Sequence, residues 1–109
     1  MRRAFRSPNA ARFQFGDVAV DLRGAEVHRG GHRVDLTARE FQLLRCLIEN
    51  RGVVLSRKTL MKNVWNYDSD VNTRTLDVHI AWLRQKLEDE PCRPRHIITA
   101  RGLGYKFVC

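Results

Sequence analysis

The residues whose types and spacing best suit a chemical task lie between Arg74 and Leu87. A helix turns by about 100° per residue, which places Leu76, Ile80, Leu83 and Leu87 on one side. The opposite side carries Arg74, Val78, Ala81 and Gln85, flanked by Thr75 and Trp82. Arginine can bond to guanine or phosphate, valine can touch a thymine methyl, and alanine permits close approach. This face favours contact with a DNA groove, although Val78 and Trp82 could instead meet another protein surface.

Two residues beside this face have alternative uses. Asp77 would repel phosphates by itself, so we expect it to pair with Arg74 or Arg84 and orient that arginine; the alternative is a solvated acid. His79 points partly inward. It could be packed within the fold, or it could reach a phosphate with its ring edge.

A second group with suitable chemistry follows the helix. Residues 96–99 and 105–108 are predicted to form two strands, joined by a glycine-containing turn at residues 100–104. Arg101 at the tip of this hairpin could enter a minor groove or meet a phosphate. The alternative is an exposed arginine in solvent.

Other elements must hold these groups in position. Short alternating stretches between residues 13 and 36, separated by turns, predict a small antiparallel sheet that packs against the rest of the chain. Thr37 and Glu40 form a capping-box signature, and the apolar residues after them predict a deeply buried helix. Ser56 caps a second helix with a narrower apolar stripe, which leads into a polar loop at residues 66–71.

The charge of the chain is concentrated at its ends. The formal net charge of the 109 residues is +8. Residues 1–12 hold four arginines and residues 91–109 hold four Lys or Arg, and neither range contains an acid. Such ends are typical of a solvated tail or of an electrostatic contact with nucleic acid. We expect residues 1–12 to form a basic flexible tail or linker, and residues 13–109 to form one domain.

The composition argues against several other classes of protein. No apolar run approaches the roughly 18 residues of a membrane span, and the first dozen residues lack the apolar core of a secretory signal, so a cytoplasmic protein is expected. The three cysteines are widely spaced, so neither disulfides nor a metal site is expected. The four histidines fall on different elements, and no nucleophile, base and orienting group occur at a recognisable spacing. We therefore expect no enzyme and no cofactor.

Several short sequence motifs occur in the same order along the chain as in a known protein family. They are LTAREFQLL at residues 36–44, VW at 64–65, RTLDVHI at 74–80, LR at 83–84 and RGLGY at 101–105. Over residues 13–109 the sequence resembles the winged-helix effector domain of OmpR/PhoB-type bacterial response regulators. The resemblance implies an α+β fold: a winged helix-turn-helix with an N-terminal four-stranded antiparallel sheet, three helices and a C-terminal β-hairpin wing.

The resemblance also implies which residues meet DNA or orient those that do. They are Trp65, Arg74, Thr75, Asp77, Val78, His79, Trp82, Arg84, Thr99, Arg101 and Tyr105. Arg74, Thr75, Val78 and His79 would face the major groove, with Asp77 orienting an arginine. Trp65 and Arg84 would meet the DNA backbone, and Thr99, Arg101 and Tyr105 would serve the wing. Relatives often have arginines where this sequence has Ala81 and Trp82, so Trp82 is expected to stack on a sugar or pack on a neighbour.

The resemblance implies sequence-specific binding of double-stranded DNA for transcriptional regulation in the bacterial cytoplasm, at the nucleoid. It further suggests a head-to-tail homodimer on direct repeats and contact of loop 66–71 with RNA polymerase. Family members usually carry an N-terminal receiver domain with an acidic phosphorylation pocket. Residues 1–12 cannot form such a pocket. The chain is thus expected to be the output domain of a two-component response regulator or a stand-alone homologue. The alternative is a winged-helix protein-interaction module.

Overall fold

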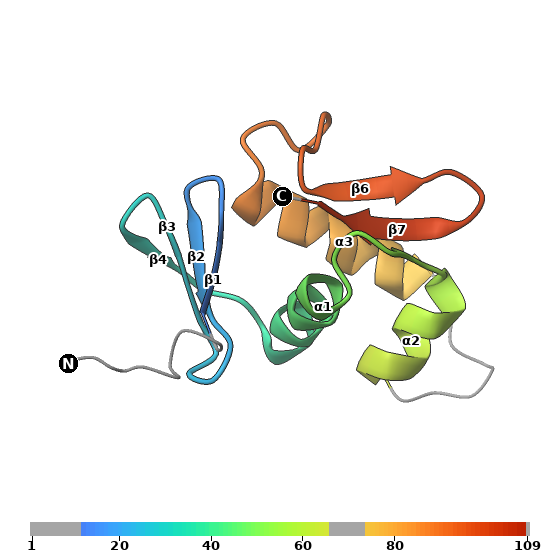
Figure 1. Ribbon diagram of the computed structural model, residues 1–109, viewed down its shortest axis with the longest axis horizontal. Coiled ribbons are helices and arrows are strands. Elements are labelled where there is room, and N and C mark those ends of the chain that lie inside the picture. The colour runs from blue at the N-terminus through green and yellow to red at the C-terminus, as the bar shows by residue number, and fades with distance from the viewer. Residues whose placement is uncertain (1–11, 66–73, 109) are drawn as a thin grey trace. The chain divides into compact units, whose positions relative to one another are not determined.

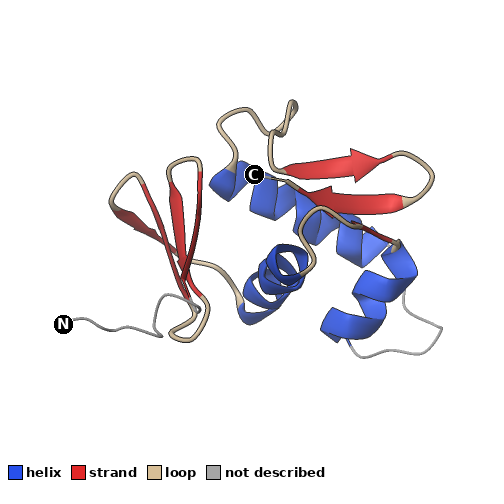
Figure 2. Cartoon of the chain, in the orientation of Figure 1, coloured by secondary structure: helices blue, strands red, loops and turns tan. Residues whose placement is uncertain are grey.

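The computed structural model describes residues 12–65 and 74–108. The chain divides into two compact units, residues 1–36 and residues 37–109. Within the described ranges the first unit contains strands alone, and the second contains three helices and a small sheet (Figures 1 and 2). No helix in those ranges is long and apolar enough to cross a membrane. The expected tail, apart from Arg12, and the loop at 66–71 lie outside them.

The first unit is the predicted four-stranded antiparallel sheet, with its strands in chain order. The strands are β1 (Arg12–Phe15), β2 (Val18–Asp21), β3 (Glu26–Arg29) and β4 (His32–Val34). Side chains alternate across the sheet, and the buried ones on one face are Phe15, Val18, Val20 and Val27. Asp21 closes the turn after β2, because its Oδ1 accepts hydrogen bonds from the amides of Arg23 and Gly24.

Helix α1 (Ala38–Glu49) begins at the predicted capping box. The amide of Glu40 donates to Thr37 Oγ1 at 3.2 Å, and the amide of Thr37 donates to Glu40 Oε1 at 2.8 Å. Lys86 Nζ also donates to Glu40 Oε1, at 2.8 Å, so the box is tied to the third helix. Burial raises the pKa of Glu40, but the hydrogen bonds from Lys86 and Thr37 outweigh burial and hold the pKa below its usual value.

Helices α2 (Arg57–Trp65) and α3 (Arg74–Leu87) both pack against α1. Ser56 caps α2 as predicted, since its Oγ accepts from the amide of Thr59 at 3.0 Å. The three helices share one apolar core. Its buried side chains are Leu43, Leu44, Leu47, Ile48, Leu60, Met61, Val64, Leu76, Ile80, Leu83 and Leu87.

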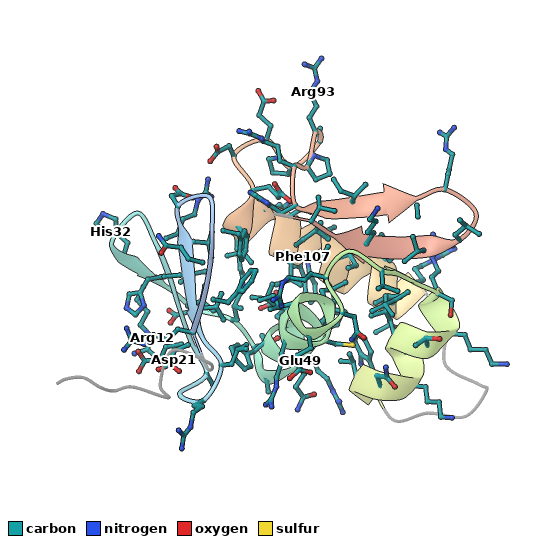
Figure 3. The ribbon with its side chains drawn as sticks, in the orientation of Figure 1. Arg12, Asp21, His32, Glu49, Arg93 and Phe107 are labelled. Atoms are coloured by element: carbon teal, nitrogen blue, oxygen red, sulfur yellow. The ribbon has the colours of Figure 1, made fainter. Side chains whose placement is uncertain are left out.

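A three-stranded antiparallel sheet completes the second unit, in the order β5–β7–β6. Its strands are β5 (Val54–Leu55), β6 (Ile97–Ala100) and β7 (Gly104–Phe107). The sequence predicts the β6–β7 hairpin but not β5, which is too short to show an alternating pattern. Phe107 is fully buried where β7 contacts α1 (Figure 3). The hairpin is therefore anchored in the same core as the helices.

Glu88, just after α3, is a buried acid that the sequence pattern does not reveal. It is 3% exposed. Its Oε1 accepts from the amide of Arg95 at 2.9 Å, and its Oε2 accepts from the amides of His96 and Ile97 at 2.9 and 2.8 Å. A carboxylate near the C-terminal end of a helix faces an unfavourable dipole. These three amides compensate for it and fix the start of β6 to the end of α3.

Candidate nucleic-acid interface

Helix α3 has one buried and one exposed face, as its sequence predicts. Its leucines and isoleucine are at most 2% exposed. The exposed residues are Arg74, Val78, Ala81, Trp82 and Gln85. Val78 is 38% exposed and Trp82 is 43% exposed, so two apolar side chains lie together with Arg74 on this face. The exposed face of the helix is therefore mixed, cationic and apolar.

His79 is packed between two tryptophans at the edge of this surface. Its ring centroid lies 4.9 Å from that of Trp65 and 4.9 Å from that of Trp82. Its Nδ1 lies 2.8 Å from the carbonyl oxygen of Thr75, which can only accept, so Nδ1 carries the proton. Trp65 is only 9% exposed, and its indole packs against His79. Its expected contact with the DNA backbone stays a prediction.

Asp77 is the centre of a polar cluster that joins α2, α3 and β7. Its Oδ1 accepts from Arg57 Nε at 3.0 Å and from the hydroxyl of Tyr105 at 2.6 Å. Burial raises the pKa of Tyr105, and the hydrogen bond to Asp77 raises it further, so the hydroxyl keeps its proton. The sequence predicts an arginine partner for Asp77 but names Arg74 or Arg84. The structure shows Arg57, which packing of α2 against α3 brings close.

Tyr105 lies largely inside the second unit, and its expected role at a DNA-binding wing stays a prediction. It is 4% exposed. The guanidinium carbons of Arg57 and Arg84 lie 5.8 and 5.7 Å from the centroid of its ring. Its ring and hydroxyl therefore hold the hairpin against the helices.

Arg84 fastens α3 to β6. Its Nε and Nη2 donate to the carbonyl oxygen of Ile97 at 3.0 and 2.8 Å, and Nη2 also donates to Thr99 Oγ1 at 2.7 Å. Burial lowers the pKa of Arg84, although the nearby Tyr105 and Glu88 act in the opposite direction. Arg84 is only partly buried, and its expected contact with the DNA backbone stays a prediction. Thr99 serves the hairpin by accepting from Arg84.

The turn between β6 and β7 projects beyond the first residues of α3 (Figure 1). The amide of Leu103 donates to the carbonyl oxygen of Ala100 at 2.8 Å, and Gly102 has a φ of 74°. This φ fits the third position of a type II turn, which favours glycine. Arg101 is exposed, and Leu103 is 66% exposed. The turn thus exposes a cation and an apolar side chain at the end of the hairpin.

Replacing Tyr105 with phenylalanine is expected to lower the free energy of unfolding by about 1–2 kcal/mol, because a hydrogen bond to a carboxylate is lost. In an Asp77→Asn background the same replacement should cost less, since the charged acceptor is already gone. Urea denaturation of the two single variants and the double variant measures this coupling. Additive effects would show that the Tyr105–Asp77 hydrogen bond contributes nothing to stability.

Three helices, with the exposed face of the last one beside a C-terminal hairpin, define the winged-helix class of proteins. The family model described as "Transcriptional regulatory protein, C terminal" matches residues 31–107. The chain belongs to this family, which comprises the OmpR/PhoB-type effector domains of response regulators.

Individual relatives agree with this assignment. The chain is 44% identical over 95 residues to the KDP operon transcriptional regulatory protein KdpE of Escherichia coli (strain K12), covering 87% of this chain and 42% of KdpE. The response regulator DrrB of Thermotoga maritima, an OmpR/PhoB homolog, has a TM-score of 0.83 and 36% identity, covering 91% of this chain and 45% of DrrB. The chain therefore spans less than half the length of the first curated relatives it matches.

One solved relative is a DNA-binding domain by itself. The RstA DNA-binding domain of Klebsiella pneumoniae, solved in complex with the RstA box, has a TM-score of 0.79 and 34% identity. The match covers 88% of this chain and 95% of that domain. The likeness thus extends over nearly the whole of a winged-helix domain.

Proposed function

We propose that this chain binds double-stranded DNA sequence-specifically to regulate transcription, and that it does so without catalysis. The single observation that carries the proposal is the exposed face of α3 beside the projecting hairpin turn. The similarity to the RstA domain, which was solved with its DNA box, supports it.

In the proposed complex, α3 lies in a major groove, which is wide enough for a helix. Arg74 bonds to guanine or phosphate, Val78 touches a thymine methyl, and Thr75 faces the same groove. Trp82 stacks on a sugar beside the helix. Arg101 enters the adjacent minor groove, where the negative potential favours a cation.

Replacing Arg74 with alanine is expected to weaken binding and to relax base preference by about 1–3 kcal/mol at the position it reads. Fluorescence anisotropy with duplexes enriched from a random library, over a range of salt concentrations, measures both effects. Arg93→Ala is the matched control, because Arg93 also is exposed and points outward from the loop between α3 and β6 (Figure 3). If Arg93→Ala and Arg74→Ala had equal effects, base reading by Arg74 would be excluded.

The second candidate function is a winged-helix protein-interaction module. The joint exposure of Val78 and Trp82 is the observation that favours it. A gel shift with a random duplex pool, compared with a pull-down from lysate, separates the two functions. If selection from random duplexes enriched no motif, sequence-specific DNA binding would be wrong.

Further parts of the proposal concern assembly, domain organisation and location. Two copies bind head-to-tail on direct repeats about one helical turn apart. Loop 66–71 contacts RNA polymerase, residues 1–12 act as a basic tail or linker, and residues 13–109 form the DNA-binding domain. The chain works in the bacterial cytoplasm, at the nucleoid, within a two-component system. The half-site spacing of the selected motif tests the arrangement of the two copies.

A further inference from the structure

Leu103, in the turn of the hairpin, is the most exposed large hydrophobic residue in the described ranges. It is 66% exposed, compared with 56% for Val53 and 43% for Trp82. Single exposed leucines are common on protein surfaces, so exposure by itself assigns no role. Two features distinguish Leu103 from the other exposed apolar residues. It lies two residues from the exposed Arg101, and the backbone around it is held in place.

The backbone on both sides of Leu103 is fixed. The amide of Leu103 donates a hydrogen bond to the carbonyl oxygen of Ala100. The next residue, Gly104, approaches β5 so closely that a Cβ would lie 2.0 Å from the carbonyl oxygen of Leu55. Tyr105 follows, and its hydroxyl donates a hydrogen bond to Asp77. Because these contacts hold the backbone of the turn, little backbone conformational entropy is lost when Leu103 is buried.

The shape of the turn indicates what covers Leu103. A stable protein interface buries a broad surface, whereas three residues separate β6 from β7 here. A minor groove is about 6 Å wide, so it admits a narrow tip and excludes a broad one. The negative potential of the groove attracts Arg101, two residues away. Charge and width both favour nucleic acid over a protein partner.

We propose that Leu103 enters the minor groove beside Arg101 and packs against the deoxyribose walls and base edges. This inference rests on the proposed DNA-binding function and adds a specificity-determining residue to it. Apolar side chains that enter a minor groove favour base steps that open or kink easily, notably pyrimidine–purine steps. Leu103 therefore contributes a preference for deformable steps, while Arg101 contributes electrostatic attraction.

A comparison of Leu103→Ala with Arg101→Ala tests the division of roles on a duplex selected by the wild-type chain. Leu103→Ala should bind about tenfold more weakly with an unchanged dependence on salt, because apolar contact but no charge is lost. Arg101→Ala should lower the salt slope by about one. Leu103→Met, which stays apolar, should bind within about threefold of wild type. Val53→Ala is the control for an exposed apolar residue outside the turn.

Parallel selections from a random duplex library, with the wild-type chain and with Leu103→Ala, distinguish two outcomes. One is that Leu103 has no role in specificity, and the other is that the chain does not bind DNA sequence-specifically. The wild-type motif should contain a preferred pyrimidine–purine step beside the part read by α3, and Leu103→Ala should lose only that preference. No motif with the wild-type chain would overturn the proposed function itself. An identical motif for both proteins, with or without weaker binding, would overturn the role of Leu103 in specificity while leaving DNA binding intact.

Discussion

Replacing Glu88 with alanine should lower the free energy of unfolding of the second unit by about 3–5 kcal/mol. The carboxylate accepts from the amides of Arg95, His96 and Ile97, and the residue is 3% exposed. Its removal leaves donors without an acceptor, among them the amide of the fully buried Ile97, and each unsatisfied buried group costs about 1–3 kcal/mol. The loss should exceed that of any surface substitution nearby.

Tryptophan fluorescence during urea denaturation measures this loss, since both tryptophans of the chain, Trp65 and Trp82, lie in the second unit. Glu90→Ala is the matched control: the residue is exposed, and its replacement should stay within about 0.5 kcal/mol of wild type. Glu88→Gln keeps one acceptor oxygen and should fall between the two. A Glu88→Ala protein as stable as the Glu90→Ala protein would mean that the three hydrogen bonds add nothing to stability.

Replacing Gly104 with alanine should destabilise the second unit by about 3 kcal/mol or more and should also weaken DNA binding. Gly104 has a φ of 145°, in a region that other residues rarely adopt. A Cβ there would lie 2.0 Å from the carbonyl oxygen of Leu55 and 2.8 Å from Ser56 Cα. Both are backbone atoms, so β5 must move away from β7. The displaced turn would then move Arg101, the cation proposed to enter the minor groove.

Gly102→Ala provides the control. It introduces a Cβ at a positive φ without bringing that Cβ close to another strand. Gly102 also has a positive φ, of 74°, but a Cβ there has no atom within 4 Å. Its replacement should cost about 1–2 kcal/mol. Denaturation and DNA titration of both variants separate the two effects. Equal losses for Gly102→Ala and Gly104→Ala would contradict the importance of the approach to β5.

Local sequence patterns determined most elements of this protein. The capping box at Thr37, the serine cap at Ser56 and the two faces of α3 depend on residues three or four apart, so a single stretch of sequence contains all the relevant information. The same is true of the four-stranded sheet, whose alternation and turns are local. The exposure of Arg74, Val78 and Arg101 followed from these patterns, and their contacts with DNA stay predictions.

The tertiary structure decided which polar residues are internal. Asp77 meets Arg57 across 20 positions of sequence and Tyr105 across 28, and no periodicity encodes such a pairing. Packing of α2 and the hairpin against α3 buries Trp65 and Tyr105 and brings Arg84 to the carbonyl oxygen of Ile97, none of which their residue types indicate. Glu88 has the sequence context of a solvated acid, and only the fold brings the amides of β6 within its reach. The physical reason is that hydrogen bonds and burial depend on distances between segments, which only the folded chain sets.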